Sequence, residues 1–198
     1  MQLNYHRMTI EITEESSKQK SVKALLWFGI VSIVMLFAGL TSAYIIRQAK
    51  GDWLKFELPS QFYISTLIII LSSVSLFFAF SSAKKDNFQA IISGTAITFL
   101  LGIAFLISQV SGWNAMVEQG IFFTGPGSSA SASFLYVITV LHAAHALGGI
   151  IVLLVVFINS LKKKYSSKKI LGLQLCSIYW HFLGVLWIYL FLFLLFVR

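Results

Sequence analysis

Five long runs of uncharged, mostly apolar residues make up most of this 198-residue chain. The expected membrane spans cover about residues 24–46, 62–83, 88–109, 134–159 and 171–197. Each run can cross a bilayer, for which about 20 apolar residues suffice. Because lipid offers no hydrogen-bond partner to open backbone, each span must be a helix. The sequence therefore predicts an all-α, polytopic membrane protein. We expect residues 24–198 to form a single five-helix transmembrane bundle and residues 1–23 to form a polar cytoplasmic head.

The distribution of basic residues predicts how the chain is oriented. Eleven of the 15 Lys and Arg residues fall on the side of the N-terminus, and 4 fall on the other side. Since positive residues stay in the cytoplasm, we expect the N-terminus to be cytoplasmic and the C-terminus outside. The net charge of +8 lies in loops, so we expect no nucleic-acid partner. A basic loop would anchor this topology or bind anionic lipid head groups, and the two roles are compatible. Its residues are Lys162, Lys163, Lys164, Lys168 and Lys169.

Three histidines are the main ionisable groups that the spans bury, with Cys176 as a weaker fourth. His142 and His145 share one face of the fourth span, and His181 lies at a similar depth in the fifth. No Asp, Glu, Lys or Arg lies inside a span, which excludes a carboxylate proton wire and a di-metal carboxylate site. We expect the histidines to form a structural cluster, hydrogen-bonded across helices. The alternative is that His142 and His181 ligate a haem from opposite faces.

Smaller polar residues in the spans favour helix packing. Five of the hydroxyl residues in the second span are expected to bond back to their own helix: Ser65, Thr66, Ser72, Ser73 and Ser75. Gly94 and Gly102 are predicted close-packing positions in the third span. Pro59 is expected at a helix start, where its missing N–H costs nothing. Residues 110–133 are predicted to form the longest loop between two spans, on the outer side of the membrane.

Several motifs occur in a fixed order along the chain. Leu58-Pro59 precedes the second span, and the fourth span carries Thr139, His142, His145 and Gly148 at three-residue spacing. The fifth span carries the string Tyr179, Trp180, His181, Phe182, followed by Trp187. With these motifs in this order, the chain resembles subunit III of the haem-copper oxidases, the cytochrome c and quinol oxidases. The resemblance extends from about Trp27 to the C-terminus.

The resemblance implies the short, five-helix bacterial form of this subunit, in the bacterial plasma (inner) membrane. It implies an accessory subunit that binds no haem or copper and has no catalytic residue of its own. Haem and copper would lie in the partner subunits I and II. The implied role is to stabilise subunit I and its lipid and proton-entry surroundings, with phospholipid as a bound partner. Membership of a larger respiratory supercomplex stays open.

Two departures from the family pattern bear on function. The family often has a glutamate where this chain has Ile33, so proton buffering by a buried carboxylate is not expected here. The family commonly has an aspartate where this chain has Gly184.

Two alternatives remain beside the cytochrome c type. One is subunit III of a quinol oxidase. The other, from a different class, is the haem b membrane anchor of a quinone-reactive dehydrogenase.

Overall fold

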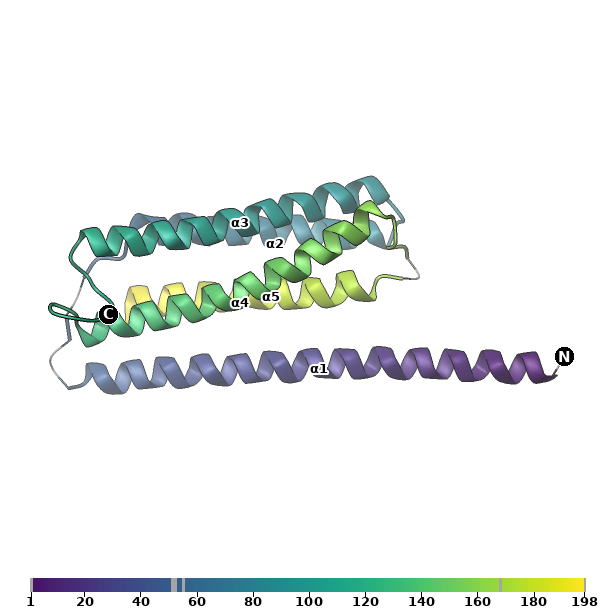
Figure 1. Cartoon of the computed structure of the whole chain (residues 1–198), viewed down its shortest axis with the longest axis horizontal. Helices are drawn as coiled ribbons and strands as arrows, with labels where there is room; N and C mark the ends of the chain where they lie inside the picture. The colour runs from purple at the N-terminus through teal and green to yellow at the C-terminus, as the bar shows by residue number, and fades with distance from the viewer. Residues whose placement is uncertain (1, 51–52, 55, 168, 198) are drawn as a thin grey trace. The chain divides into compact units, whose positions relative to one another are not determined.

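Five α-helices account for the regular structure that is described. The computed structural model describes residues 2–50, 53–54, 56–167 and 169–197, with side chains from Ser17 onwards. The helices are α1 (Gln2–Gln48), α2 (Ser60–Ala83), α3 (Phe88–Glu118), α4 (Ala130–Leu161) and α5 (Leu171–Phe196) (Figure 1). All are long and apolar enough to cross a membrane, in α1 over Ser17–Gln48. The predicted all-α, five-span membrane fold is confirmed.

The chain divides into two compact units at a point inside α1, residues 1–36 and residues 37–198. In the first unit the predicted polar head is helical from Gln2 and continuous with the apolar residues that follow. Residues 2–23 contain no proline or glycine that would interrupt a helix. The cytoplasmic location of this head stays a prediction.

Helices α2 to α5 of the second unit form a closed ring. Helix α2 packs on α3, α3 on α4, α4 on α5, and α5 returns to α2 (Figure 1). The last part of α1 meets this ring through side chains. The ring of Tyr44 lies 5.9 Å from that of Phe134 and 5.1 Å from that of Phe193, between centroids. The Tyr189 hydroxyl donates to Thr41 Oγ1 at 3.3 Å.

The loop predicted over residues 110–133 is wrong at its start, because α3 continues to Glu118. Two polar side chains favour this longer helix by bonding to neighbouring helices. Gln109 Nε2 donates to Ser65 Oγ at 2.8 Å, and Trp113 Nε1 donates to Thr139 Oγ1 at 3.0 Å. The helix ends before Gly120, whose φ of 76° suits glycine.

Polar residues cap the first turns of two helices, and a hydrogen bond links two of the loops between helices. Asn87 and Ser129 each accept a hydrogen bond from a first-turn backbone N–H, at the starts of α3 and α4. Pro59 immediately precedes α2, where no helical N–H is required. The Ser167 N–H donates to Asp86 Oδ1 at 2.6 Å. The α2–α3 and α4–α5 connections therefore lie together at one end of the ring.

Candidate functional site

His142 joins α4 to α5. Its imidazole is fully buried, and its Nε2 lies 3.0 Å from the backbone oxygen of Leu183. Because a carbonyl only accepts, Nε2 carries the proton and donates it. Nδ1 is then an unprotonated acceptor, buried with no hydrogen-bond partner among the described residues. The rings of Phe37, Phe105 and Trp187 lie 6.4, 5.8 and 5.1 Å from the imidazole, between centroids.

His145 lies half-buried on the same helix, one turn further along. Its Nδ1 donates to the backbone oxygen of Leu141, in its own helix, at 2.7 Å. Its ring lies 5.8 Å from that of Phe37, which is also beside His142. The backbone oxygen of His145 accepts a hydrogen bond from the Tyr179 hydroxyl at 3.3 Å. Phe37 is thus the ring that the two histidines share.

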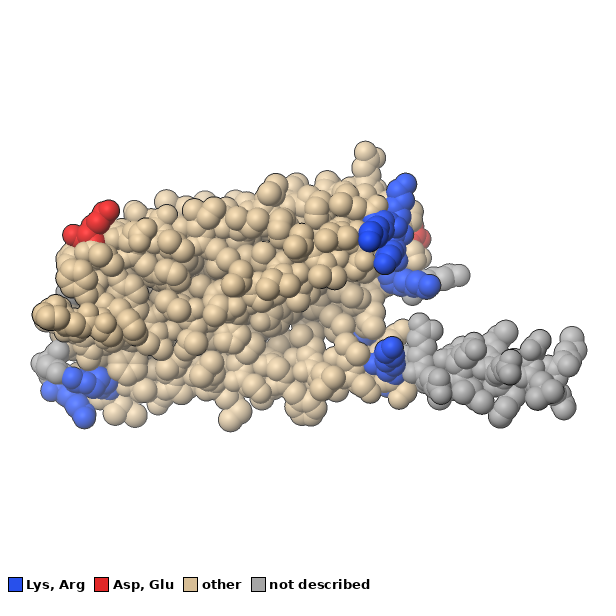
Figure 2. Space-filling model, in the orientation of Figure 1, with Lys and Arg blue, Asp and Glu red and all other residues tan. Residues whose placement is uncertain are grey.

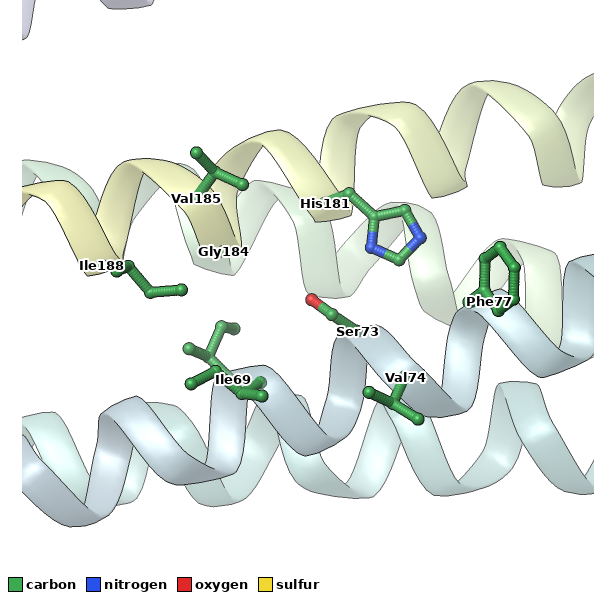
Figure 3. A pocket seen from close by; sticks show the side chains of 9 residues that line it. Ile69, Ser73, Val74, Phe77, His181, Gly184, Val185 and Ile188 are labelled. Atoms are coloured by element: carbon green, nitrogen blue, oxygen red, sulfur yellow. The ribbon is translucent and has the colours of Figure 1, made fainter.

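His181 lies apart from the other two histidines. It is half-buried and lines an open pocket between α2 and α5 (Figure 3). Among the hydrogen bonds and ring contacts of the described residues, none joins His181 to His142 or His145. The structure therefore brings two of the three predicted histidines together and places the third toward α2.

Tryptophan indoles connect the helices through hydroxyl groups. At 3.0 Å each, Trp180 Nε1 donates to Ser72 Oγ, Trp187 Nε1 to Thr66 Oγ1, and Trp113 Nε1 to Thr139 Oγ1. Each hydroxyl in turn donates to a carbonyl of its own helix, as Ser72 does to Ile69. Each of these hydroxyls therefore donates a hydrogen bond within its own helix and accepts one from an indole of another helix.

The hydroxyl residues of α2 behave largely as predicted. Ser65, Thr66 and Ser72 bond back to carbonyls of α2 itself, which confirms that expectation for these three. Ser75 differs, because its hydroxyl donates to the backbone oxygen of Gly94 in α3 at 3.0 Å. The Ser73 hydroxyl has no hydrogen bond among the described residues.

Trp180 contacts all three other helices of the ring. Besides its bond to Ser72 of α2, its indole lies against Gly102 of α3 and Gly149 of α4. A Cβ built on Gly102 would lie 2.9 Å from Trp180 Cη2, and one on Gly149 would lie 3.1 Å from its Cε3. The two glycines therefore make room for a tryptophan that is 1% exposed.

Two other motif residues, Gly148 and Phe182, are less tightly packed within the chain. A Cβ at Gly148 would meet nothing within 4 Å, so this glycine does not serve close packing within the chain. Phe182 is half-buried.

Sequence reasoning missed Gln109, which it treated only as the end of a span. Gln109 is fully buried, bonded to Ser65, with Oε1 unpartnered among the described residues. An amide inside an apolar run was the signal that could have found it.

The predicted basic loop lies at the end of the ring where Asp86 and Ser167 meet. Four of its lysines are exposed: Lys162, Lys163, Lys164 and Lys169. Lys168 lies outside the described residues. On the face that Figure 2 shows, lysine and arginine side chains lie toward the helix ends, with uncharged surface between them (Figure 2). This distribution suits a protein whose middle faces hydrocarbon.

The described part of the chain holds no group of three or more His, Cys, Asp or Glu placed to share a metal ion. Its one cysteine, Cys176, is buried and unpaired. The fold and this site define a multi-pass membrane protein whose buried polar groups bond helix to helix.

Comparison with known proteins gives the family. A family model described as cytochrome c oxidase subunit III matches residues 54–197. The chain is 31% identical to cytochrome c oxidase subunit 3 of Corynebacterium diphtheriae, over 83% of this chain and 82% of that protein. It is 30% identical to a probable cytochrome c oxidase subunit 3 of Nocardia farcinica, over 90% of this chain and 88% of that one. The chain therefore belongs to the cytochrome c oxidase subunit III family.

A further relative is named for a different electron donor. Subunit 3 of the cytochrome bo(3) ubiquinol oxidase of Pseudomonas aeruginosa is 28% identical over 82% of this chain and 78% of that protein. Family membership confirms the resemblance seen in the motifs. It makes this chain a subunit III of a haem-copper oxidase, associated with the oxidase complex. It does not favour a dehydrogenase haem anchor.

Proposed function

We propose that this chain is the accessory subunit III of a proton-pumping terminal oxidase of the cytochrome c oxidase type. In this proposal it packs beside subunit I, and subunit II belongs to the same complex. The supporting observation is how the chain uses its buried polar groups. The imidazole of His142 donates to the Leu183 carbonyl, and three indoles donate to hydroxyls of other helices. These groups hold the bundle together, and the redox centres belong to the partners.

The proposal includes a location and a lipid environment. The chain would lie in a bacterial plasma membrane with its N-terminus in the cytoplasm. The exposed lysines of the 162–169 loop would then face the cytoplasmic leaflet, where anionic head groups attract basic residues by about 1 kcal/mol each. Here the subunit would stabilise subunit I and its proton-entry surroundings. Ile33 supplies no carboxylate for proton storage, so this support would be structural.

Purification in mild detergent tests the proposal. The tagged chain should co-purify with a haem-bearing subunit, and a reduced-minus-oxidised spectrum of the complex should show haem. The same spectrum of the chain alone should show none. A colourless chain without partners, from membranes whose other complexes stay intact, would contradict the proposal. A haem b band from the isolated chain would favour the dehydrogenase anchor instead.

A second candidate is subunit III of a quinol oxidase, favoured by the similarity to the ubiquinol oxidase subunit. Metal analysis separates the two candidates, because subunit II of a cytochrome c oxidase carries a copper centre of its own. We expect the purified complex to contain that centre and to oxidise cytochrome c. A complex without it that oxidises quinol would replace the first candidate with the second.

A further inference from the structure

A groove between α2 and α5 opens on the outside of the helix ring. Its volume is about 420 Å³, and aliphatic and aromatic side chains of both helices line most of it. Three residues differ from this apolar lining: His181, Ser73 and Gly184. Figure 3 shows His181 and Ser73 projecting into the space between the two helices from opposite sides (Figure 3). The groove is thus apolar with two polar groups facing each other across it.

Neither polar side chain has a hydrogen-bond partner among the residues that the structure describes. A neutral imidazole offers one donor and one acceptor, and a serine hydroxyl offers both as well. Among the hydrogen bonds of the described residues, none involves the side chain of His181 or of Ser73. Polar side chains at membrane depth almost always face a partner group, because hydrocarbon cannot hydrogen-bond.

Their depth excludes lipid as the partner. His181 lies ten residues after Leu171, and Ser73 lies ten residues before Ala83. At about 1.5 Å per residue, both lie about 15 Å from their helix ends. The Asp86–Ser167 hydrogen bond holds those two ends together. In a hydrocarbon core about 30 Å thick, this depth is the midplane, which head groups do not reach.

We propose that this groove receives a transmembrane helix of another oxidase subunit, and that this helix carries Asn, Gln, Ser or Thr to bond His181 and Ser73. Gly184 favours close approach, because it adds no side chain to the groove. A Cβ there would lie 3.0 Å from Ser73 Oγ. Small residues let helix backbones approach in membranes, and polar side chains then bond across the interface. This inference rests on the proposed packing beside a partner subunit.

Photo-crosslinking of the assembled complex in native membranes tests the proposal. A photoreactive residue replaces Val185, which lines the groove and is 66% exposed. The control replaces Leu100, a 64% exposed apolar residue at a similar depth on α3. The Val185 probe should link to one helix of a partner subunit, within a turn of an Asn, Gln, Ser or Thr. The Leu100 probe should give lipid adducts.

Several products would overturn the proposal. They are lipid adducts alone at Val185, a link to residues 17–36 of this chain or to a second copy, and a partner helix without a polar residue in reach. Equal partner yields at both positions would overturn it as well.

Substitutions give an independent readout. His181→Leu should make the partner dissociate about threefold to tenfold more readily in a detergent titration, the range expected for one intramembrane hydrogen bond. His181→Gln, which keeps a donor and an acceptor, should retain the partner. The thermal unfolding temperature of the isolated chain should change little, because the His181 imidazole has no hydrogen bond to the described residues of this chain. Equal retention of the Leu and Gln variants would overturn the inference.

A second pair guards against misfolding of the histidine variants. Val185→Trp fills the mouth of the groove from an exposed position, and Leu100→Trp adds the same bulk elsewhere. Only Val185→Trp should weaken partner retention. If the wild-type chain retains no haem-bearing subunit, the proposed function fails. If it does, and neither Val185→Trp nor His181→Leu weakens retention, the groove inference alone fails.

Discussion

Gly102 makes room for the indole of Trp180, whereas Gly148 on the next helix faces nothing within 4 Å. We expect Gly102→Ala to destabilise the bundle by about 1–3 kcal/mol, because its Cβ would lie 2.9 Å from Trp180 Cη2. Gly148→Ala should be neutral or stabilise by up to about 1 kcal/mol, through helix propensity. Thermal unfolding in detergent, followed by tryptophan fluorescence, measures both. Equal effects would mean that Trp180 does not need the space at Gly102.

The two histidines of α4 differ in whether their side-chain hydrogen bond connects two helices or stays within one. We expect His142→Leu to cost about 1 kcal/mol of stability, since its bond to Leu183 spans two helices. His145→Leu should cost less, because its bond stays within α4. Detergent-denaturant titration of the purified chain compares the two. Correctly assembled complexes of either variant should keep their full haem content. Haem loss from intact His142→Leu complex would assign that residue a ligand role.

Helix α5 is attached to α2 by indole–hydroxyl bonds, and a double-mutant cycle measures one of them. Trp187→Phe removes the donor, and Thr66→Val removes the acceptor at 3.0 Å. We expect a coupling free energy of about 0.5–2 kcal/mol between them. The pair Trp187→Phe and Ser65→Ala serves as the control, since no hydrogen bond joins those two side chains. Additive losses in the Trp187–Thr66 pair would show that the bond contributes nothing.

The helices themselves followed from the sequence, because lipid leaves an apolar run few options. The end of α3 did not, since a polar residue such as Gln109 looks like the edge of a span. Burial and a bond to Ser65 keep it inside the helix, and that contact depends on which helices are neighbours. Pattern along the chain does not carry that information.

The same limit applied to the site. That hydroxyls of α2 would bond back to their own helix could be predicted, because the bond is local. Their second role, accepting from Trp180 and Trp187, could not, because the indoles are more than a hundred residues away in the chain. The separation of His181 from His142 likewise depends on the rotation of α5, which depth alone does not specify.

At the scale of the whole molecule, charge predicts which end faces the cytoplasm. Ser128→Cys, in the exposed α3–α4 connection, should react with an impermeant thiol reagent on intact cells. Lys163→Cys should react only after the membrane is opened. The native Cys176 is buried and should contribute little background. Labelling in the reverse order would invert the orientation inferred from the 11 basic residues on one side and 4 on the other.

The contacts of Trp180 also bear on how the protein is made. Helix α5 is synthesised after α2, α3 and α4, so Ser72, Gly102 and Gly149 stay without their indole until α5 has been made. A chain truncated before residue 171 would keep a gap on its inner side. Membrane quality-control proteases would recognise such a chain as incompletely folded, because only α5 supplies the indole that fills this space.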